Sequence, residues 1–187
     1  MGSDLLFGNR QNGLTWCIEG DYAKLAADHN LGHALYMGYA TEYLIPFVQF
    51  PLGINPWPEL SGLVPFARNC FADVFLLDEV GQVYFFDISS SELSKIAEDQ
   101  DEFRSLISDD CDGWLLRPLV DACRHAGLGL KEGQCYAFKL PTLLGGEYRT
   151  ENICVAVLDE WMRFMRDMHH QVGHLPDGAT VDIEFVD

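Results

Sequence analysis

The stretch DVFLLDEVGQVYFFDIS, residues 73–89, decides how we expect this chain to fold. It holds two runs of β-branched and aromatic residues, separated by the four residues from Asp78 to Gly81. Residues of these types favour strands, whereas closely spaced Asp and Gly favour a tight turn. The stretch therefore predicts a β-hairpin near the middle of the chain.

A short helix is expected after the hairpin, in EDQDEFRSLI (residues 98–107). Asp99 is a suitable N-cap, and Glu102 stands three residues later, as a capping box requires. The apolar residues that would share one face of this helix are Phe103, Leu106 and Ile107.

Two further helices are expected from apolar residues at helical spacing. GWLLRPLVDACRHAGLG (residues 113–129) would stop at Gly127, and DEWMRFMRDMHHQV (residues 159–172) is amphipathic. The residues expected to face inward are Leu115, Leu119, Ala122 and Cys123 in the first helix, and Trp161, Phe164, Met165, Met168 and Val172 in the second.

Strands are expected in GQCYAFKL (133–140), in NICVAVL (152–158) and at the chain end, where Val181, Ile183 and Phe185 alternate with polar residues. Strands with interposed helices predict an α+β class: a mostly antiparallel sheet covered by helices. The 187 residues, 48% of them apolar, suit a single compact domain. We expect residues 1–60 to form an N-terminal segment and residues 61–187 the α+β domain.

A double glycine in KLPTLLGGEYRTEN (residues 139–152) raises the question of phosphate binding. A phosphate-binding loop places its glycines between a strand and the N-terminus of a helix. Here a strand pattern follows instead. We therefore interpret Leu143 to Gly146 as a turn whose backbone angles favour glycine.

Charge is the strongest compositional signal, since 29 acidic and 12 basic residues give a formal net charge of −17. Nucleic acid is an unfavourable partner for such a chain, because phosphate contacts require clustered Lys and Arg. The acids concentrate between Glu92 and Asp112. This concentration fits either a solvated face or a surface complementary to a basic protein.

Six cysteines are spread singly, without a C-x-x-C pair, and we expect them to be small buried hydrophobic residues in a reduced compartment. No apolar run approaches the roughly 20 residues of a membrane span, and the first residues lack the order of a secretory signal. We expect a cytoplasmic protein without a membrane partner.

Candidate catalytic groups are few. His170 and His174 stand four residues apart, a helical spacing that suits a metal, but Gly173 and Pro176 suggest that the helix ends there. Cys123 and His125 are two residues apart, which separates their side chains on a helix. We expect no catalytic residue, no metal and no cofactor.

Several stretches together resemble a known family. They are LVPFARNCFADVFLLDEVGQVYFFDI (63–88), LLRPL (115–119), GLKEGQCYAFKLPTLLGGEYRTENICVAVL (129–158) and HLPDGATVDI (174–183). This set resembles the C-terminal domain of immunity proteins that neutralise type VI secretion DNase effectors, a family similar in style to the SMI/KNR-type toxin-immunity group. The resemblance covers about residues 61–187.

The resemblance implies a non-enzymatic protein that binds and neutralises a secreted toxin, with a basic nuclease as the partner. The expected partner-binding residues are Glu98, Asp99, Asp101, Glu102, Asp109, Asp110 and Asp112, with Trp57 or Trp114 as aromatic anchors. Two alternatives remain open: a ligand-binding or regulatory module on the same scaffold, and a metal-dependent hydrolase using carboxylates or His170 and His174.

Overall fold

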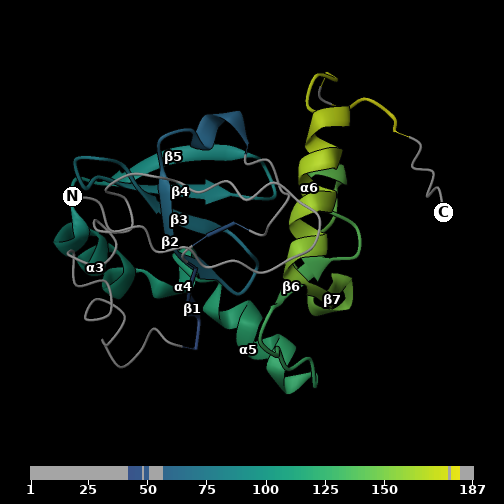
Figure 1. Ribbon diagram of the computed structural model, residues 1–187. Coiled ribbons are helices and arrows are strands. Elements are labelled where there is room, and N and C mark those ends of the chain that lie inside the picture. The colour runs from purple at the N-terminus through teal and green to yellow at the C-terminus, as the bar shows by residue number, and fades with distance from the viewer. Residues whose placement is uncertain (1–41, 48, 51–56, 177, 182–187) are drawn as a thin grey trace, which may run out of the picture.

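The computed structural model describes residues 42–47, 49, 50, 57–176 and 178–181. These residues form a five-stranded sheet and a two-stranded sheet, with helices packed around them (Figure 1). The expected α+β class, with antiparallel sheets covered by helices in one compact domain, is confirmed. None of the helices in this described part is long and apolar enough to cross a membrane.

The large sheet is an antiparallel meander in which each strand pairs with the next one along the chain. Its strands are β1 (Leu44–Pro46), β2 (Val64–Asn69), β3 (Val74–Leu77), β4 (Val83–Asp87) and β5 (Glu92–Ala97). The predicted hairpin is confirmed as β3 and β4. Its turn is held by the Asp78 carboxylate, which accepts hydrogen bonds from the backbone N–H groups of Val80 at 3.0 Å and Gln82 at 2.9 Å.

The small sheet pairs β6 (Gln134–Phe138) with β7 (Ile153–Val157), as the two strand patterns predicted. The helices within the described residues are α3 (Gln100–Asp109), α4 (Cys111–Trp114), α5 (Arg117–His125) and α6 (Leu158–Val172). Short 3₁₀ helices cover Pro58–Leu60, Thr142–Leu144 and Thr150–Asn152. The expected final strand contains Ile183 and Phe185, which lie outside the described residues.

One expected helix is in fact two. Between α4 and α5, Leu116 adopts a left-handed conformation with φ of 50°, and Pro118 follows within the first turn of α5. Proline is tolerated in a first turn but not in a helix interior, so the chain breaks and restarts here. The inward face also differs from expectation, because Val120 is fully buried and Ala122 is exposed.

Three strands of the large sheet, β1, β2 and β5, were not predicted from the sequence. In β5 the polar residues are largely exposed, as expected for a strand at the edge of the sheet. β1 pairs with β2, and the Trp57 ring lies 4.9 Å from that of Phe86 in the core. The domain division after residue 60 stays a prediction, although these earlier residues share the sheet and core of the later ones.

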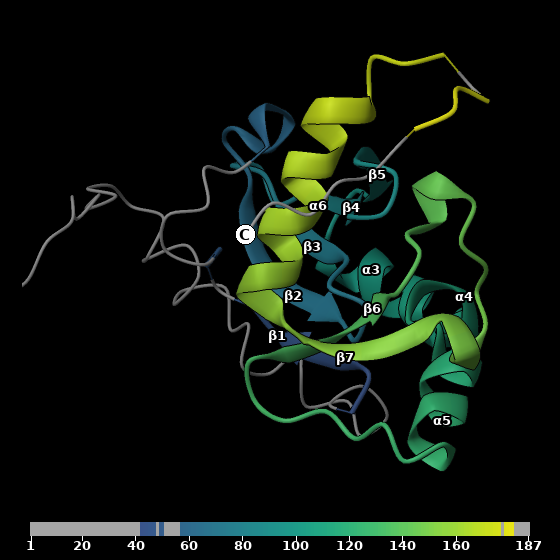
Figure 2. The ribbon, with the colours of Figure 1, turned by 90° about the vertical axis from the view of Figure 1, so that its right-hand side faces the viewer.

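Strand β3 is buried on both faces. Val74 and Leu76 point into the core beneath α6, whereas Phe75 and Leu77 point into the core beneath α3. Successive side chains of a strand alternate between faces, so a continuous apolar run suits a strand covered on both sides. Helix α6 stands along one side of the sheet in Figure 1, and Figure 2 shows it in front of the strands.

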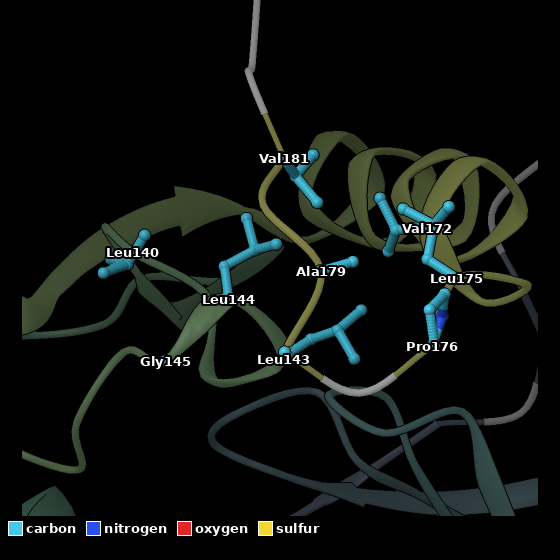
Figure 3. Close-up of a pocket in the computed structure, with 10 residues that line it drawn as sticks. Leu140, Leu143, Leu144, Gly145, Val172, Leu175, Pro176, Ala179 and Val181 are labelled. Carbon is cyan, nitrogen blue, oxygen red and sulfur yellow. The ribbon is translucent and has the colours of Figure 1, made fainter.

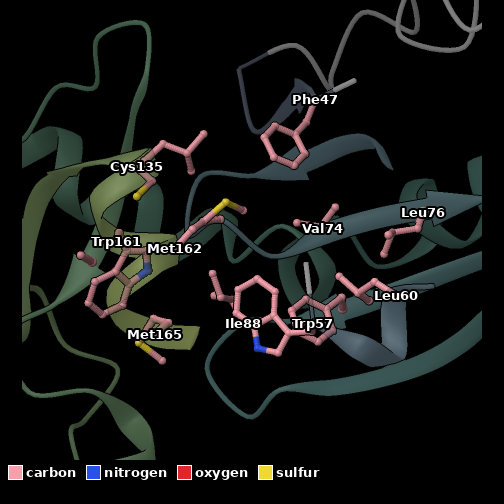
Figure 4. Close-up of a cluster of buried hydrophobic side chains, with 14 of the residues drawn as sticks. Phe47, Trp57, Leu60, Val74, Leu76, Ile88, Cys135, Trp161, Met162 and Met165 are labelled. Atoms are coloured by element: carbon pink, nitrogen blue, oxygen red, sulfur yellow. The ribbon is translucent and has the colours of Figure 1, made fainter. Parts of the chain in front are cut away.

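Helix α6 contributes its apolar face to the first of these cores. Met162 and Met165 are fully buried there against the sheet, with Trp161 beside them (Figure 4). Trp161, Met165 and Met168 are buried as predicted, while Met162 was missed by the sequence analysis. Truncating a buried methionine to alanine typically costs about 2–5 kcal/mol, so α6 is a major contributor to stability.

A third core joins the two sheets. Val120 and Cys123 of α5 pack with Tyr136 and Phe138 of β6 around Phe71, which lies between β2 and β3. The backbone N–H of Tyr136 donates to the carbonyl of Cys70 at 2.8 Å. The corner between β2 and β3 therefore docks directly on the small sheet.

A polar clasp formed by Asn69 and Asp73 closes this corner. The Asn69 amide oxygen accepts hydrogen bonds from the backbone N–H groups of Phe71 and Asp73, and its Nδ2 donates to Asp73 Oδ2 at 2.7 Å. Asp73 Oδ1 accepts from the backbone N–H of Ile88 at 3.1 Å. The clasp holds Ala72 at φ of 73°, a conformation rare for residues other than glycine.

Stability should depend on the protonation of the clasp. Burial, together with the nearby Asp87 carboxylate, raises the pKa of Asp73 from 3.8 to about 7, although hydrogen bonds from Asn69 and Ile88 oppose the shift. The folded protein thus holds this proton more tightly than the unfolded chain does. The contribution of Asp73 is complete below about pH 4 and is lost as the pH rises to about 7.

We predict that the free energy of unfolding of the wild type, relative to Asp73→Asn, falls between about pH 4 and pH 7 by on the order of 1–4 kcal/mol. Urea denaturation at several pH values measures the slope. The exposed-site variant Asp109→Asn should keep the wild-type slope. An Asp73→Asn protein with the wild-type slope would contradict the prediction.

Candidate partner-binding surface

The acidic residues expected to bind a partner lie around α3 and α4. All seven are exposed at their positions in the structure. Between Glu98 and Arg117 they are opposed by two arginines, so this segment carries a formal net charge of −5. We call the seven residues the acidic surface: Glu98, Asp99, Asp101, Glu102, Asp109, Asp110 and Asp112.

Three of these carboxylates cap helices. Asp99 is the N-cap of α3, and its Oδ1 accepts hydrogen bonds from the backbone N–H groups of Asp101 and Glu102, both at 2.9 Å. Glu102 Oε2 accepts from the backbone N–H of Glu98 at 2.6 Å, one residue before the position of an ideal capping box. Asp110 caps α4 by accepting from the N–H of Gly113 at 2.9 Å.

Three others form ion pairs with neighbouring bases. Glu98 lies 2.7 Å from Lys95 Nζ, and Asp112 lies 2.6 Å from Arg117 Nε. Asp101 pairs with Arg104 one turn along α3. The Arg117 guanidinium lowers the pKa of Asp112, mainly by donating a hydrogen bond to it. Exposed pairs of this kind are screened by solvent and contribute little to stability, so they leave the carboxylates accessible to a stronger partner.

Asp109 differs from the other six residues of the acidic surface, because it neither caps a helix nor forms an ion pair within the described part of the chain. No hydrogen bond or ion pair joins its side chain to the described part of the chain. It lies in the last turn of α3, where the helix dipole disfavours negative charge. A residue that is unfavourable for the helix is available for a partner's cation.

The expected aromatic anchors differ in exposure. Trp57 is 4% exposed and lies in the core below α6, so its assignment as an exposed anchor is wrong. Trp114 is half-buried and packs edge-on against Phe85, with ring centroids 5.3 Å apart. Its place at the end of α4 leaves it next to the acidic surface.

The residues considered for catalysis do not assemble into a site. His169 Nε2 lies 3.2 Å from the Ile88 carbonyl, His170 is exposed, and His174 follows the end of α6. Cys123 is fully buried, and burial raises its pKa. Within the described ranges, no group of three or more His, Cys, Asp or Glu side chains could hold a metal ion.

The double-glycine loop forms a turn, as interpreted from the sequence. Gly145 ends the 3₁₀ helix Thr142–Leu144 with φ of 87°. At Gly146 an added Cβ would lie 1.7 Å from the Leu140 carbonyl oxygen, so a side chain cannot be accommodated without a shift. The loop borders a cavity of about 480 Å³ whose lining side chains are apolar, among them Leu144, Val172 and Leu175 (Figure 3).

A second cavity, of about 580 Å³, lies between β1, the end of β2, and the loop 129–133. Arg68, only 4% exposed, lines it together with Arg124 and Lys131. Arg68 was not among the site residues predicted from the sequence. The signal in the sequence was a single arginine inside the mostly apolar run LVPFARNCFADVF, whose other polar residues are Asn69 and Asp73.

The segment that contains the acidic surface is similar to a known protein family. The family described as T6SS immunity protein Tdi1, C-terminal, matches residues 97–169. The match begins at the end of β5 and runs to α6, so it covers about two fifths of the chain. The resemblance to type VI secretion immunity proteins is thereby confirmed. No curated protein matches the chain.

We predict that Asp99→Ala lowers the free energy of unfolding by about 1 kcal/mol, because two backbone N–H groups of α3 lose their acceptor. Asp109→Ala removes a charge that the dipole of α3 disfavours and removes no cap, so it should not lower the free energy of unfolding and should raise it by up to about 1 kcal/mol. Urea denaturation of both variants measures the difference. Equal losses would show that net charge, and not capping, sets the effect.

Proposed function

We propose that this protein is a cytoplasmic, non-enzymatic immunity protein that binds a secreted bacterial toxin, a nuclease, and covers its DNA-binding surface with the acidic surface. The observation that carries the proposal is the position of these acids. All seven residues of the acidic surface fall inside the segment 97–169, which matches the T6SS immunity family.

The physical basis is charge complementarity. Nucleases hold DNA with clustered Lys and Arg, which attract phosphate groups along the backbone. A folded protein with a net charge of −17 and exposed carboxylates on two adjacent helices presents a negative electrostatic field, similar to that of the DNA phosphate backbone. Such fields accelerate encounter and reject partners of the same sign, which suits an inhibitor that has to reach its toxin before the toxin reaches DNA.

The carboxylates of the acidic surface differ in mobility, because some of them cap helices and others do not. One carboxylate oxygen of Asp99 and one of Asp110 accept hydrogen bonds from backbone N–H groups. These bonds fix the direction of the other oxygen of each carboxylate. Carboxylates fixed in this way lose little side-chain entropy on binding. Asp101, Asp109 and Asp112 are free of capping roles and can reorient toward a cationic side chain.

The toxin is first identified by co-purification with the tagged protein from its native host. We predict that the triple variant Asp101→Asn, Asp109→Asn and Asp112→Asn weakens binding to the purified toxin by about 3- to 150-fold, because exposed pairs contribute about 0.2–1 kcal/mol each. The dependence of affinity on salt should weaken with it. Titration calorimetry at several salt concentrations measures both.

The matched control is Glu79→Gln, Glu151→Gln and Glu160→Gln, which removes the same charge from exposed positions outside the acidic surface. It should bind nearly as the wild type does. Equal weakening by both triple variants would assign the effect to net charge. An unchanged affinity and salt dependence in the first variant would contradict the role of the acidic surface.

A further inference from the structure

Arg68 is a buried cation without a carboxylate partner in the described part of the chain. Its Nη1 donates to the Asn69 carbonyl and its Nη2 to the Gln134 carbonyl, both at 3.0 Å. A guanidinium has five N–H donors, so three are not used by these contacts. Desolvation by burial lowers the pKa of Arg68, as expected for a charge without a counter-ion.

The other cations of the second cavity differ from Arg68 in this respect. Arg124 is paired with Glu42 at 3.2 Å and with Asp121 at 3.6 Å, and its guanidinium lies 4.7 Å from the centre of the Tyr43 ring. Lys131 is exposed at the rim. Arg68 therefore supplies the one positive charge of the lining that is both buried and uncompensated.

The charges of the lining favour a singly charged anion. Arg68, Arg124 and Lys131 are opposed by Glu42 and Glu132, which leaves a formal charge of +1. A monoanion neutralises this charge, whereas a dianion such as hydrogen phosphate would leave an excess negative charge beside two carboxylates. A carboxylate also matches the planar fork of the guanidinium.

Apart from Gln134, the remaining lining is apolar and suits a hydrocarbon body. Ile45, Pro46, Phe47, Leu130 and Leu158 contribute to it. A volume of about 580 Å³ lies within the roughly 300–1,000 Å³ of small-molecule sites, which combine apolar walls with a few polar groups.

We propose that this cavity binds a small monocarboxylate, with Arg68 holding the carboxylate and the apolar lining holding a short hydrocarbon chain. The site lies between β1, β2 and the loop 129–133, away from α3. It is therefore independent of the proposed toxin binding, and its failure would leave that proposal intact.

The probe is hexanoate, titrated into the full-length protein by calorimetry, with hexanamide as the neutral analogue and inorganic phosphate as the hydrophilic anion. We expect saturable binding of hexanoate with a Kd on the order of 1 mM or lower, and at least about 10-fold weaker binding of both comparison compounds. Arg68→Gln should raise the Kd for hexanoate at least about 10-fold, while Arg68→Lys, which keeps the charge, should retain part of the affinity. The control Arg149→Gln, at an exposed site, should bind as the wild type does.

A second variant tests the cavity in case the Arg68→Gln protein does not fold. Gly129 lines the cavity, and an added Cβ there meets no atom within 4 Å, so Gly129→Leu should fold and obstruct the cavity. It should weaken hexanoate binding at least about 10-fold. The proposal is overturned if the wild type shows no saturable binding, if hexanamide or phosphate binds equally well, or if a folded Arg68→Gln or Gly129→Leu protein retains the wild-type affinity.

Discussion

Strand β3 is buried on both faces, and the other elements of the domain are arranged to cover it. Its side chains alternate between two cores, so α3 has to cover one face and α6 the other. Fully burying a phenylalanine such as Phe75 contributes about 1.5–3 kcal/mol. Because α3 begins where β5 ends, covering this face also brings the acidic residues into one region of the surface.

The corner after β2 shows how polar groups link the two sheets. Asn69 and Asp73 satisfy the backbone of a tight turn, and Arg68, next to them, donates to the carbonyl of Gln134 at the start of β6. Buried polar groups are costly unless hydrogen-bonded, so these contacts fix how the sheets meet. The same corner leaves Arg68 with donors that these contacts do not use and places it in the lining of a cavity, which makes it both a structural link and a candidate anion site.

The acidic surface combines stability with the proposed recognition. Asp99 and Asp110 stabilise α3 and α4 by capping, while Asp109 opposes the dipole of its own helix. A carboxylate that weakens its helix is explained more easily by an external partner than by folding. This contrast separates Asp109 from the acids whose positions the local structure already explains.

Local turn chemistry and periodicity were enough to predict several elements from the residues alone: the β3–β4 hairpin, the capped start of α3, the strands β6 and β7, and the amphipathic face of α6. The place of Trp57 in the core and the edge position of β5 emerged only in the folded molecule, because they depend on contacts between distant residues. The break between α4 and α5 has a local cause in Pro118, but its position at Leu116 became apparent only in the structure. The acids around α3 were visible in the sequence as a charge cluster. The sequence did not reveal that Arg68 lacks a carboxylate partner among the residues that the structure describes, since the absence of a counter-ion becomes apparent only when the neighbouring elements are in place.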